Sequence, residues 1–203
     1  MRKDEIVLVI DKSGSMAAIK DDAIGGFNSF IAEQRKYDRD ASVTFALFDD
    51  RYQLVCNGRD IRGMEALTEE TYRPSGMTAL LDAVGRTIDR VGDRLDSLPE
   101  SDKPENVIVF ILTDGRENAS SDYSRDKVRE MIEHQESKYG WEFIYGGANQ
   151  DAFSEAGGLG IKARNTFEFE ASGQGTRRAF DESSEFVARY RNDLPENEPK
   201  KRK

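Results

Sequence analysis

The feature that most constrains the fold is a pair of short, uninterrupted aliphatic runs that lie far apart in the chain. The first is Ile6 to Ile10 and the second is Val107 to Leu112. Each run is short for a buried helix and rich in β-branched residues, which favours a strand with both faces buried. Such strands are typical of parallel sheets that carry helices on each side.

The rest of the chain alternates between strand and helix patterns. Short apolar stretches predict strands at 43–48, 52–56, 141–145 and 166–169, and the turn at Asp49-Asp50 makes the strand at 52–56 antiparallel. Apolar residues at helical spacing predict helices at about 16–37, 80–98, 126–138, 150–156 and 176–190. This alternation predicts an α/β fold of three layers, doubly wound and Rossmann-like, with a mostly parallel sheet.

One domain over residues 5–192 accounts for the pattern, because no internal repeat or linker interrupts it. Residues 193–203 form a charged tail, predicted to be disordered, in which 195–203 holds no apolar residue besides proline. The formal net charge of −9 should repel a phosphate backbone. Nucleic-acid binding is therefore not expected, except through the basic end of the tail, Lys200 to Lys203.

The cysteine count and the N-terminal segment predict a compartment. Cys56 is the only cysteine, which excludes an intramolecular disulfide and a cysteine-based zinc site. The apolar run that follows Met1 to Glu5 is too short for a signal peptide or a membrane span. We therefore expect a cytoplasmic protein that does not enter a membrane.

Carboxylate and hydroxyl side chains follow the two aliphatic runs. Asp11-Lys12-Ser13-Gly14-Ser15 comes after the first run, Thr113-Asp114-Gly115 comes after the second, and Thr78 precedes the helix at 80–98. Ligands of open α/β sheets bind at the carboxyl ends of the strands. If the two strands adjoin, five candidate ligands meet at one edge of the sheet: Asp11, Ser13, Ser15, Thr78 and Asp114.

These five side chains offer only hard oxygen donors, with no histidine or cysteine placed near them. Oxygen ligands select Mg²⁺, Mn²⁺ or Ca²⁺ over Zn²⁺ or Cu²⁺. We expect Mg²⁺, with Mn²⁺ and Ca²⁺ as alternatives. Two carboxylates balance a divalent ion and three hydroxyls add no further charge. The ion should therefore still attract an acidic residue from a protein partner.

The same pattern resembles the metal-ion-dependent adhesion site of the von Willebrand factor type A (vWA) domain. The resemblance rests on Asp-x-Ser-x-Ser after the first strand, a lone Thr before the second long helix and Thr-Asp-Gly after the fourth strand. It covers roughly residues 5–192 and implies a six-stranded sheet in the order 3-2-1-4-5-6, with the third strand antiparallel. The segment 146–151 lies outside the pattern and suggests an intracellular subgroup, bacterial or phage-like.

The resemblance also implies roles for the ligands. Ser13, Ser15 and Thr78 would contact the ion through their hydroxyls, and Asp11 and Asp114 would act largely through water. One position would stay open for a partner's Asp or Glu. The implied function is a non-catalytic interaction module.

Each residue by itself also has a simpler interpretation. Ser13, Ser15 and Thr78 are each typical helix caps when they are considered singly. Lys12 fits a solvated, variable position, His134 a surface position and Cys56 a packed one. The glycine-rich stretch at 157–160 lacks dinucleotide-binding spacing and predicts a turn.

Two other functions compete with the interaction module. One is a Mg²⁺-dependent phosphoryl-transfer hydrolase with Asp11 as nucleophile. Against it, the residue two positions later is Ser13 rather than a second acid, and no lysine for a phosphate is identifiable. The other is a vestigial metal site, which the complete set of five oxygen donors argues against.

Overall fold

Six strands form one sheet whose spatial order differs from the order along the chain. The computed structural model describes residues 3–148 and 152–192. Its strands are β1 (Lys3–Asp11), β2 (Asp40–Phe48), β3 (Tyr52–Asp60), β4 (Asn106–Thr113), β5 (Glu142–Ala148) and β6 (Thr166–Phe169). They lie in the order β3-β2-β1-β4-β5-β6, with β3 antiparallel to β2 and the other neighbours parallel. The predicted order and directions are confirmed.

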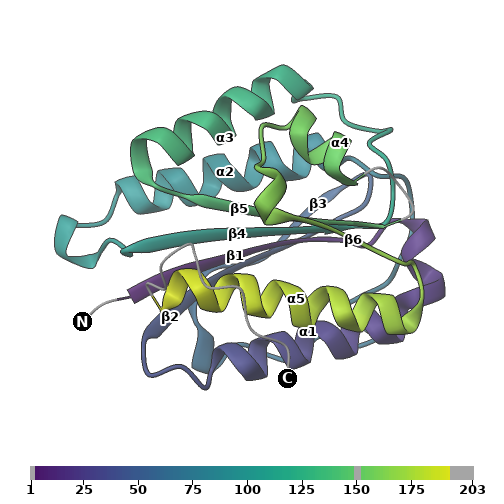
Figure 1. The fold of residues 1–203 in the computed structure, drawn as a ribbon, viewed down its shortest axis with the longest axis horizontal. Coiled ribbons are helices and arrows are strands. Elements are labelled where there is room, and N and C mark those ends of the chain that lie inside the picture. The colour runs from purple at the N-terminus through teal and green to yellow at the C-terminus, as the bar shows by residue number, and fades with distance from the viewer. Residues whose placement is uncertain (1–2, 149–151, 193–203) are drawn as a thin grey trace.

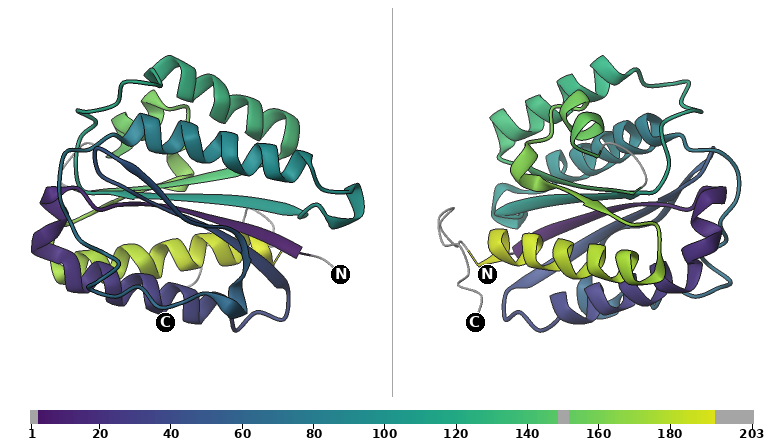
Figure 2. Two further views of the ribbon diagram at one scale, coloured as in Figure 1. Left: turned by 180° about the vertical axis from the view of Figure 1, so that it is seen from behind. Right: turned by 45° about the vertical axis from the view of Figure 1, so that its right-hand side comes forward.

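Helices cover both faces of this sheet. The α-helices are α1 (Lys20–Gln34), α2 (Leu80–Asp96), α3 (Arg125–Tyr139), α4 (Ala152–Gly158) and α5 (Gly173–Arg191). Short 3₁₀ helices are η1 (Gly14–Ile19), η2 (Ile61–Gly63), η3 (Glu100–Asp102) and η4 (Ala163–Asn165). Figure 1 and Figure 2 show α1 and α5 on one face and α2, α3 and α4 on the other. The predicted three-layer α/β fold is therefore confirmed.

The central strand β1 explains why its sequence is apolar without interruption. Successive side chains of a strand point to opposite faces. Ile6, Leu8 and Ile10 pack in the core beneath α1 and α5, whereas Val7 and Val9 pack in the core with α2 and α3. Both faces of β1 are thus removed from water, which stabilises the strand in the middle of the sheet.

The first helix begins later than its apolar spacing predicts. Residues Gly14–Ile19 form η1, in which the Met16 amide donates to the Ser13 carbonyl at 3.1 Å, and α1 begins only at Lys20. A 3₁₀ turn is tighter than an α-helical turn. This tight turn keeps Ser13 and Ser15 close to the end of β1.

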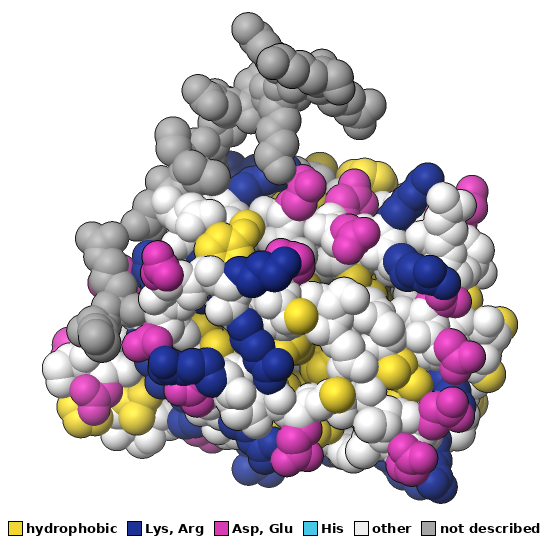
Figure 3. All heavy atoms as spheres, turned by 90° about the horizontal axis from the view of Figure 1, so that it is seen from below, with side chains coloured by type: hydrophobic (Ala, Val, Ile, Leu, Met, Phe, Trp, Pro, Cys, Tyr) yellow, Lys and Arg dark blue, Asp and Glu magenta, His cyan; other side chains and the backbone are white. Residues whose placement is uncertain are grey.

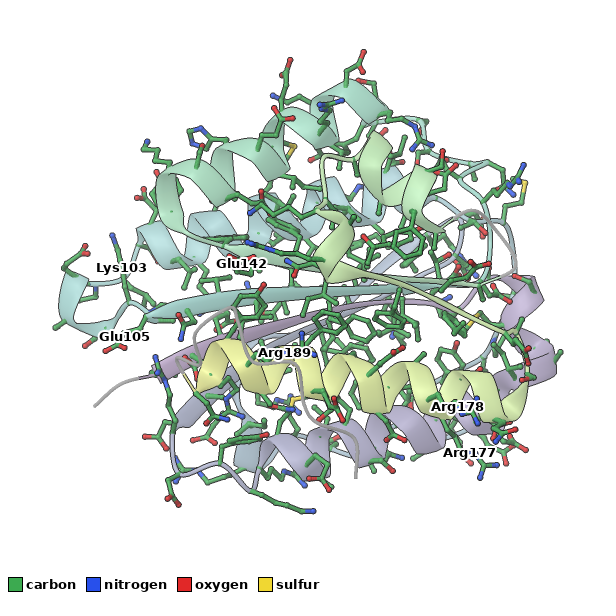
Figure 4. The ribbon with its side chains drawn as sticks, viewed as in Figure 1. Lys103, Glu105, Glu142, Arg177, Arg178 and Arg189 are labelled. Atoms are coloured by element: carbon green, nitrogen blue, oxygen red, sulfur yellow. The ribbon has the colours of Figure 1, made fainter. Side chains whose placement is uncertain are left out.

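The two ends of the sheet are far apart and carry different residues. In Figure 4, Arg177 and Arg178 lie at the carboxyl end of the parallel strands, in the first part of α5. Lys103 and Glu105 mark the opposite end, in the loop that enters β4. All five predicted ligands belong to the carboxyl end or to the segments that adjoin it.

Several smaller predictions can be compared with the structure. His134 is exposed and Cys56 is buried, as predicted. The face of the molecule that α1 and α5 cover carries acidic and basic side chains interspersed with apolar atoms (Figure 3). Among the described residues, no helix has the length and apolarity needed to cross a membrane. The predicted tail at 193–203 and the start of the helix predicted at 150–156 lie outside the described residues.

Candidate metal centre

Three chain segments meet at the carboxyl end of the sheet. Strands β1 and β4 pair in parallel, with Ile10 opposite Leu112, so the residues that follow them leave the sheet side by side. The segment before α2 joins them because the Gly14 amide donates to the Gly76 carbonyl at 3.1 Å. Gly76 has a φ of 69°, a left-handed conformation that glycine adopts without steric cost. The predicted meeting of the three loops is therefore present.

Hydroxyl and carboxylate oxygens form a continuous group across these loops. The Ser13 and Ser15 Oγ atoms lie 3.2 Å apart, and Ser15 Oγ donates to Asp114 Oδ1 at 2.6 Å. A Cβ atom at position 115 would lie 2.8 Å from Thr78 Oγ1 and 3.7 Å from Ser15 Oγ. Gly115 therefore leaves room for the Thr78 hydroxyl to approach the same group.

Asp11 lies beneath this group and is fully buried. Its Oδ1 accepts a hydrogen bond from the Ser13 amide and its Oδ2 accepts one from Thr113 Oγ1, both at 2.6 Å. The Asp11 carbonyl accepts a further bond from the Tyr72 hydroxyl at 2.6 Å. Asp11 thus orients the serine loop. Thr113 could have been noticed because it opens the Thr-Asp-Gly motif, whereas nothing in the sequence marks Tyr72.

None of the three candidate hydroxyls caps a helix. Ser13 precedes η1 without a capping hydrogen bond from its side chain, and α2 starts after Ala79, whose side chain has no oxygen. The amides at the start of α2 bond instead to the loop that follows Asp114. Glu117 Oε2 accepts from the Leu81 amide at 2.9 Å. The helix-cap interpretation is therefore wrong, and the hydroxyls are free of that role.

The loop after β4 is also fastened to the segment that carries Thr78. Asn118 Oδ1 accepts from the Thr78 amide at 2.9 Å, and the Asn118 amide donates to the Thr78 carbonyl at 3.0 Å. In return, the Asp82 carboxylate accepts from the backbone amides of residues 121–123. Thr78 and Asp114 are consequently held in a defined relative position.

Lys12 is not the solvated residue that the sequence suggests. Its side chain is buried and forms an ion pair with Asp49, which is also buried, at the end of β2. The prediction was wrong because the partner lies 37 positions away in the sequence. Only the parallel pairing of β1 with β2 brings Lys12 and Asp49 together.

Comparison with known proteins identifies the architecture. No protein-family model and no curated protein sequence matches the chain. Among solved structures, proximal thread matrix protein 1 from the mussel byssus matches with a TM-score of 0.64 and 15% identity, over 91% of this chain and 46% of that one. The von Willebrand factor domain of the pilus tip protein Mfa5 from Porphyromonas gingivalis matches with a TM-score of 0.65 and 11% identity, over 98% of each chain. The chain has the vWA fold.

Two further structures show what other proteins of this fold hold. One structure of the mussel protein has zinc in its metal-ion-dependent adhesion site. The TRAP protein of Plasmodium vivax is manganese-loaded and matches with a TM-score of 0.58 and 17% identity, over 88% of this chain and 72% of that one. The present chain spans about half the length of the mussel protein.

The pKa values of two aspartates at this end of the vWA fold, Asp11 and Asp114, are raised above the ordinary value. Burial raises the pKa of Asp11 to about 6, although Thr113 and Ser13 donate hydrogen bonds that oppose the shift. Burial also raises the pKa of Asp114, against a hydrogen bond from Ser15. No Lys or Arg within residues 3–148 and 152–192 forms an ion pair with either aspartate. The two carboxylates therefore lie in a poorly hydrated site without a protein cation.

The chemistry of this donor set fits a divalent cation in the vWA fold. Hard oxygens from two carboxylates and three hydroxyls suit Mg²⁺ or Mn²⁺, and a cation would offset the cost of two buried carboxylates. The described residues contain no group of three or more His, Cys, Asp or Glu suited to a metal. The candidate centre therefore depends on its hydroxyls as much as on its acids.

The same geometry is unfavourable for the hydrolase hypothesis. Both carboxylate oxygens of Asp11 already accept hydrogen bonds, which lowers their nucleophilicity. The ammonium of Lys12, the lysine next to Asp11 in the sequence, is paired with Asp49 and is not available to bind a phosphate. Asp11 is built to orient the loop that bears the serines.

Proposed function

We propose that this chain is a vWA domain that binds Mg²⁺ and, through the ion, an acidic residue of a protein partner. Five residues would hold the ion: Asp11, Ser13, Ser15, Thr78 and Asp114. The module would be non-catalytic. A cytoplasmic location stays a prediction that rests on the sequence.

One observation supports this proposal more than any other. Oxygens of Ser13, Ser15 and Asp114 form a hydrogen-bonded chain, while the buried Asp11 and Asp114 have no cationic partner among the described residues. Buried carboxylates are normally paired or bound to a metal. A solved structure of the mussel protein, which has the same fold, has zinc in its metal-ion-dependent adhesion site, and this supports the proposal.

Each residue would contribute in its own way. The bound ion would supply the positive charge that a partner carboxylate needs in order to approach an acidic protein. Ser13, Ser15 and Thr78 present neutral oxygens, so they leave that charge unreduced. Asp114 Oδ1 accepts a hydrogen bond from Ser15 Oγ and so orients that hydroxyl. Asp11 holds the serine loop through the Ser13 amide, and Thr113 holds Asp11.

Calorimetric titration with Mg²⁺ and Mn²⁺ tests the ion site. The wild type should bind one ion, and Asp114→Ala should bind none. Asp122→Ala is the matched control, because Asp122 lies in the same loop region but is exposed and paired with Arg86. Control binding should equal that of the wild type. Equal heats for Asp114→Ala and the wild type would contradict the assignment.

Partner binding and catalysis separate the two candidate functions. A partner captured in Mg²⁺ should be released by EDTA and should fail to bind Asp114→Ala, whereas Asp122→Ala should retain it. Hydrolysis of p-nitrophenyl phosphate should be absent with and without Mg²⁺. Mg²⁺-dependent hydrolysis that is lost in Asp11→Asn would establish the hydrolase instead.

A further inference from the structure

The loop that carries the two serines contains a buried ion pair that the metal ligands do not explain. Lys12 lies between Asp11 and Ser13, yet its side chain is 9% exposed and that of Asp49 is fully buried. Buried ion pairs often add little stability in comparison with apolar residues of similar volume. Their presence in a site of defined geometry therefore suggests a role in positioning.

Hydrogen bonds of Lys12 and Asp49 connect the serine loop, the end of β2 and the segment that carries Thr78. The Lys12 amide donates to the Phe48 carbonyl at 2.7 Å, and the Lys12 carbonyl accepts from the Ser75 amide at 2.8 Å. Asp49 Oδ2 accepts from Ser75 Oγ at 3.0 Å, and the Asp49 carbonyl accepts from the Ala79 amide at 2.9 Å. Ser75 and Ala79 bracket Thr78, so the pair connects the serine loop with the threonine ligand.

Hydrogen bonds from neighbouring residues stabilise the negative charge of Asp49. Burial opposes ionisation of Asp49, but hydrogen bonds from Lys12 and from the amide and guanidinium of Arg51 outweigh it and lower its pKa to about 2. Asp49 is therefore ionised at neutral pH and is held by both Lys12 and Arg51. The pair of Lys12 and Asp49 can fix distances in the site.

We propose that Lys12 and Asp49 are positioning residues whose ion pair sets the placement of Ser13 and Ser15 relative to Thr78, and so sets the affinity for a divalent cation. The inference rests on the proposed metal site. It assigns a function to the residue between Asp11 and Ser13. It also assigns one to a residue outside the three ligand segments.

Electrostatics and positioning predict opposite signs for one substitution. Lys12→Met removes the positive charge of a residue that adjoins two ligands in the sequence, so Coulomb's law alone predicts tighter binding. Loss of positioning predicts weaker binding. The double variant Lys12→Met/Asp49→Leu replaces the buried pair with apolar side chains and leaves the net charge of the protein unchanged, so a loss of affinity there does not come from a change in net charge.

Mn²⁺ titration followed by electron paramagnetic resonance measures the affinity directly. Relative to the wild type, both Lys12→Met and the double variant should bind Mn²⁺ about tenfold more weakly, the lower end of effects seen for residues that orient metal ligands. Ser75 is an exposed residue, and Ser75→Ala removes only the hydroxyl that bonds to Asp49, so the variant should fold normally and show a smaller loss. Circular dichroism melts confirm that each variant is folded.

A matched pair of substitutions controls for general effects. Lys20→Met/Glu69→Leu removes an ion pair of 2.9 Å on neighbouring segments whose acid is exposed, and it should leave Mn²⁺ affinity unchanged. Wild-type affinity in both the folded double variant and Ser75→Ala would overturn this inference alone, provided that Asp114→Ala has lost binding. No Mn²⁺ binding by the wild type would overturn the metal site itself and this inference with it.

Discussion

Both ends of the sheet contain buried carboxylates, but these carboxylates differ in whether an arginine or a lysine pairs with them. At the amino end, Asp4 pairs with Arg191 at 3.1 Å and with Arg39 at 2.9 Å, and Glu5 pairs with Arg94 at 2.6 Å. At the carboxyl end, Asp11 and Asp114 have hydroxyl and amide donors but no Lys or Arg partner among the described residues.

Two of these three arginines come from helices on opposite faces of the sheet, and Arg39 lies in the loop between α1 and β2. Arg191 is the last residue of α5 and Arg94 lies in the last turn of α2. Adjacent residues of β1 point to opposite faces, so Asp4 and Glu5 each meet a different helix. The acids at the amino end therefore fasten helices to the sheet. At the carboxyl end, Asp49 is paired with Lys12, but Asp11 and Asp114 orient loops and have no Lys or Arg partner among the described residues.

The largest effect is expected at the amino end. Arg191→Met should destabilise the protein by about 3–5 kcal/mol, because it leaves the buried Asp4 without its innermost partner. Urea unfolding followed by circular dichroism measures the loss. Arg189→Met is the control, since Arg189 is exposed on the same helix, and it should change stability by less than about 0.5 kcal/mol. If the two substitutions lower the stability equally, the ion pair of Asp4 and Arg191 does not have the structural role assigned to it.

The next effect concerns cation binding at the carboxyl end. Free Mg²⁺ at roughly 100 times its dissociation constant should stabilise the wild type by about 2.7 kcal/mol, because the ion binds only the folded state. Thermal melts with and without Mg²⁺ detect this as a rise in Tm, which EDTA should reverse. Arg191→Met should retain the full rise. If Mg²⁺ fails to raise the Tm of the wild type, the aspartates at the carboxyl end that lack a Lys or Arg partner among the described residues do not bind the ion.

The smallest effect has the opposite sign from the first. Asp114→Asn keeps an oxygen that accepts from Ser15 but removes an unpaired buried charge. Burial raises the pKa of Asp114, so the charged form is disfavoured in the folded state, and in EDTA at neutral pH the substitution should raise stability slightly. Urea unfolding in EDTA measures this gain, and the variant should show no response to Mg²⁺. A marked loss of stability would mean that Asp114 is a structural acid like Asp4.

Local sequence patterns predicted most of the fold. The runs at Ile6 to Ile10 and Val107 to Leu112 identified β1 and β4 because a strand buried on both faces leaves no polar position. The spacing of α2 was equally informative, and its predicted start at Leu80 agrees with the structure. Boundaries were less predictable. β3 continues to Asp60 because it keeps its pairing with β2, a contact that propensity does not encode.

The candidate site was only partly accessible from the sequence. Asp11, Ser13, Ser15, Thr78 and Asp114 were identifiable because oxygen donors directly follow strands or precede a helix. Tyr72, Asn118 and Asp49 were missed, since each acts on a ligand segment through a contact between residues that are distant in sequence.

The sequence by itself determined the alternation of strands and helices and the oxygen character of the candidate site, because burial pattern and donor type are local properties of the chain. The tertiary structure decided which charges are balanced. Lys12 is paired with Asp49, and Asp4 with Arg191, whereas Asp11 and Asp114 are not paired within the described residues. Charge balance depends on distances between segments, and those distances exist only once the sheet has assembled.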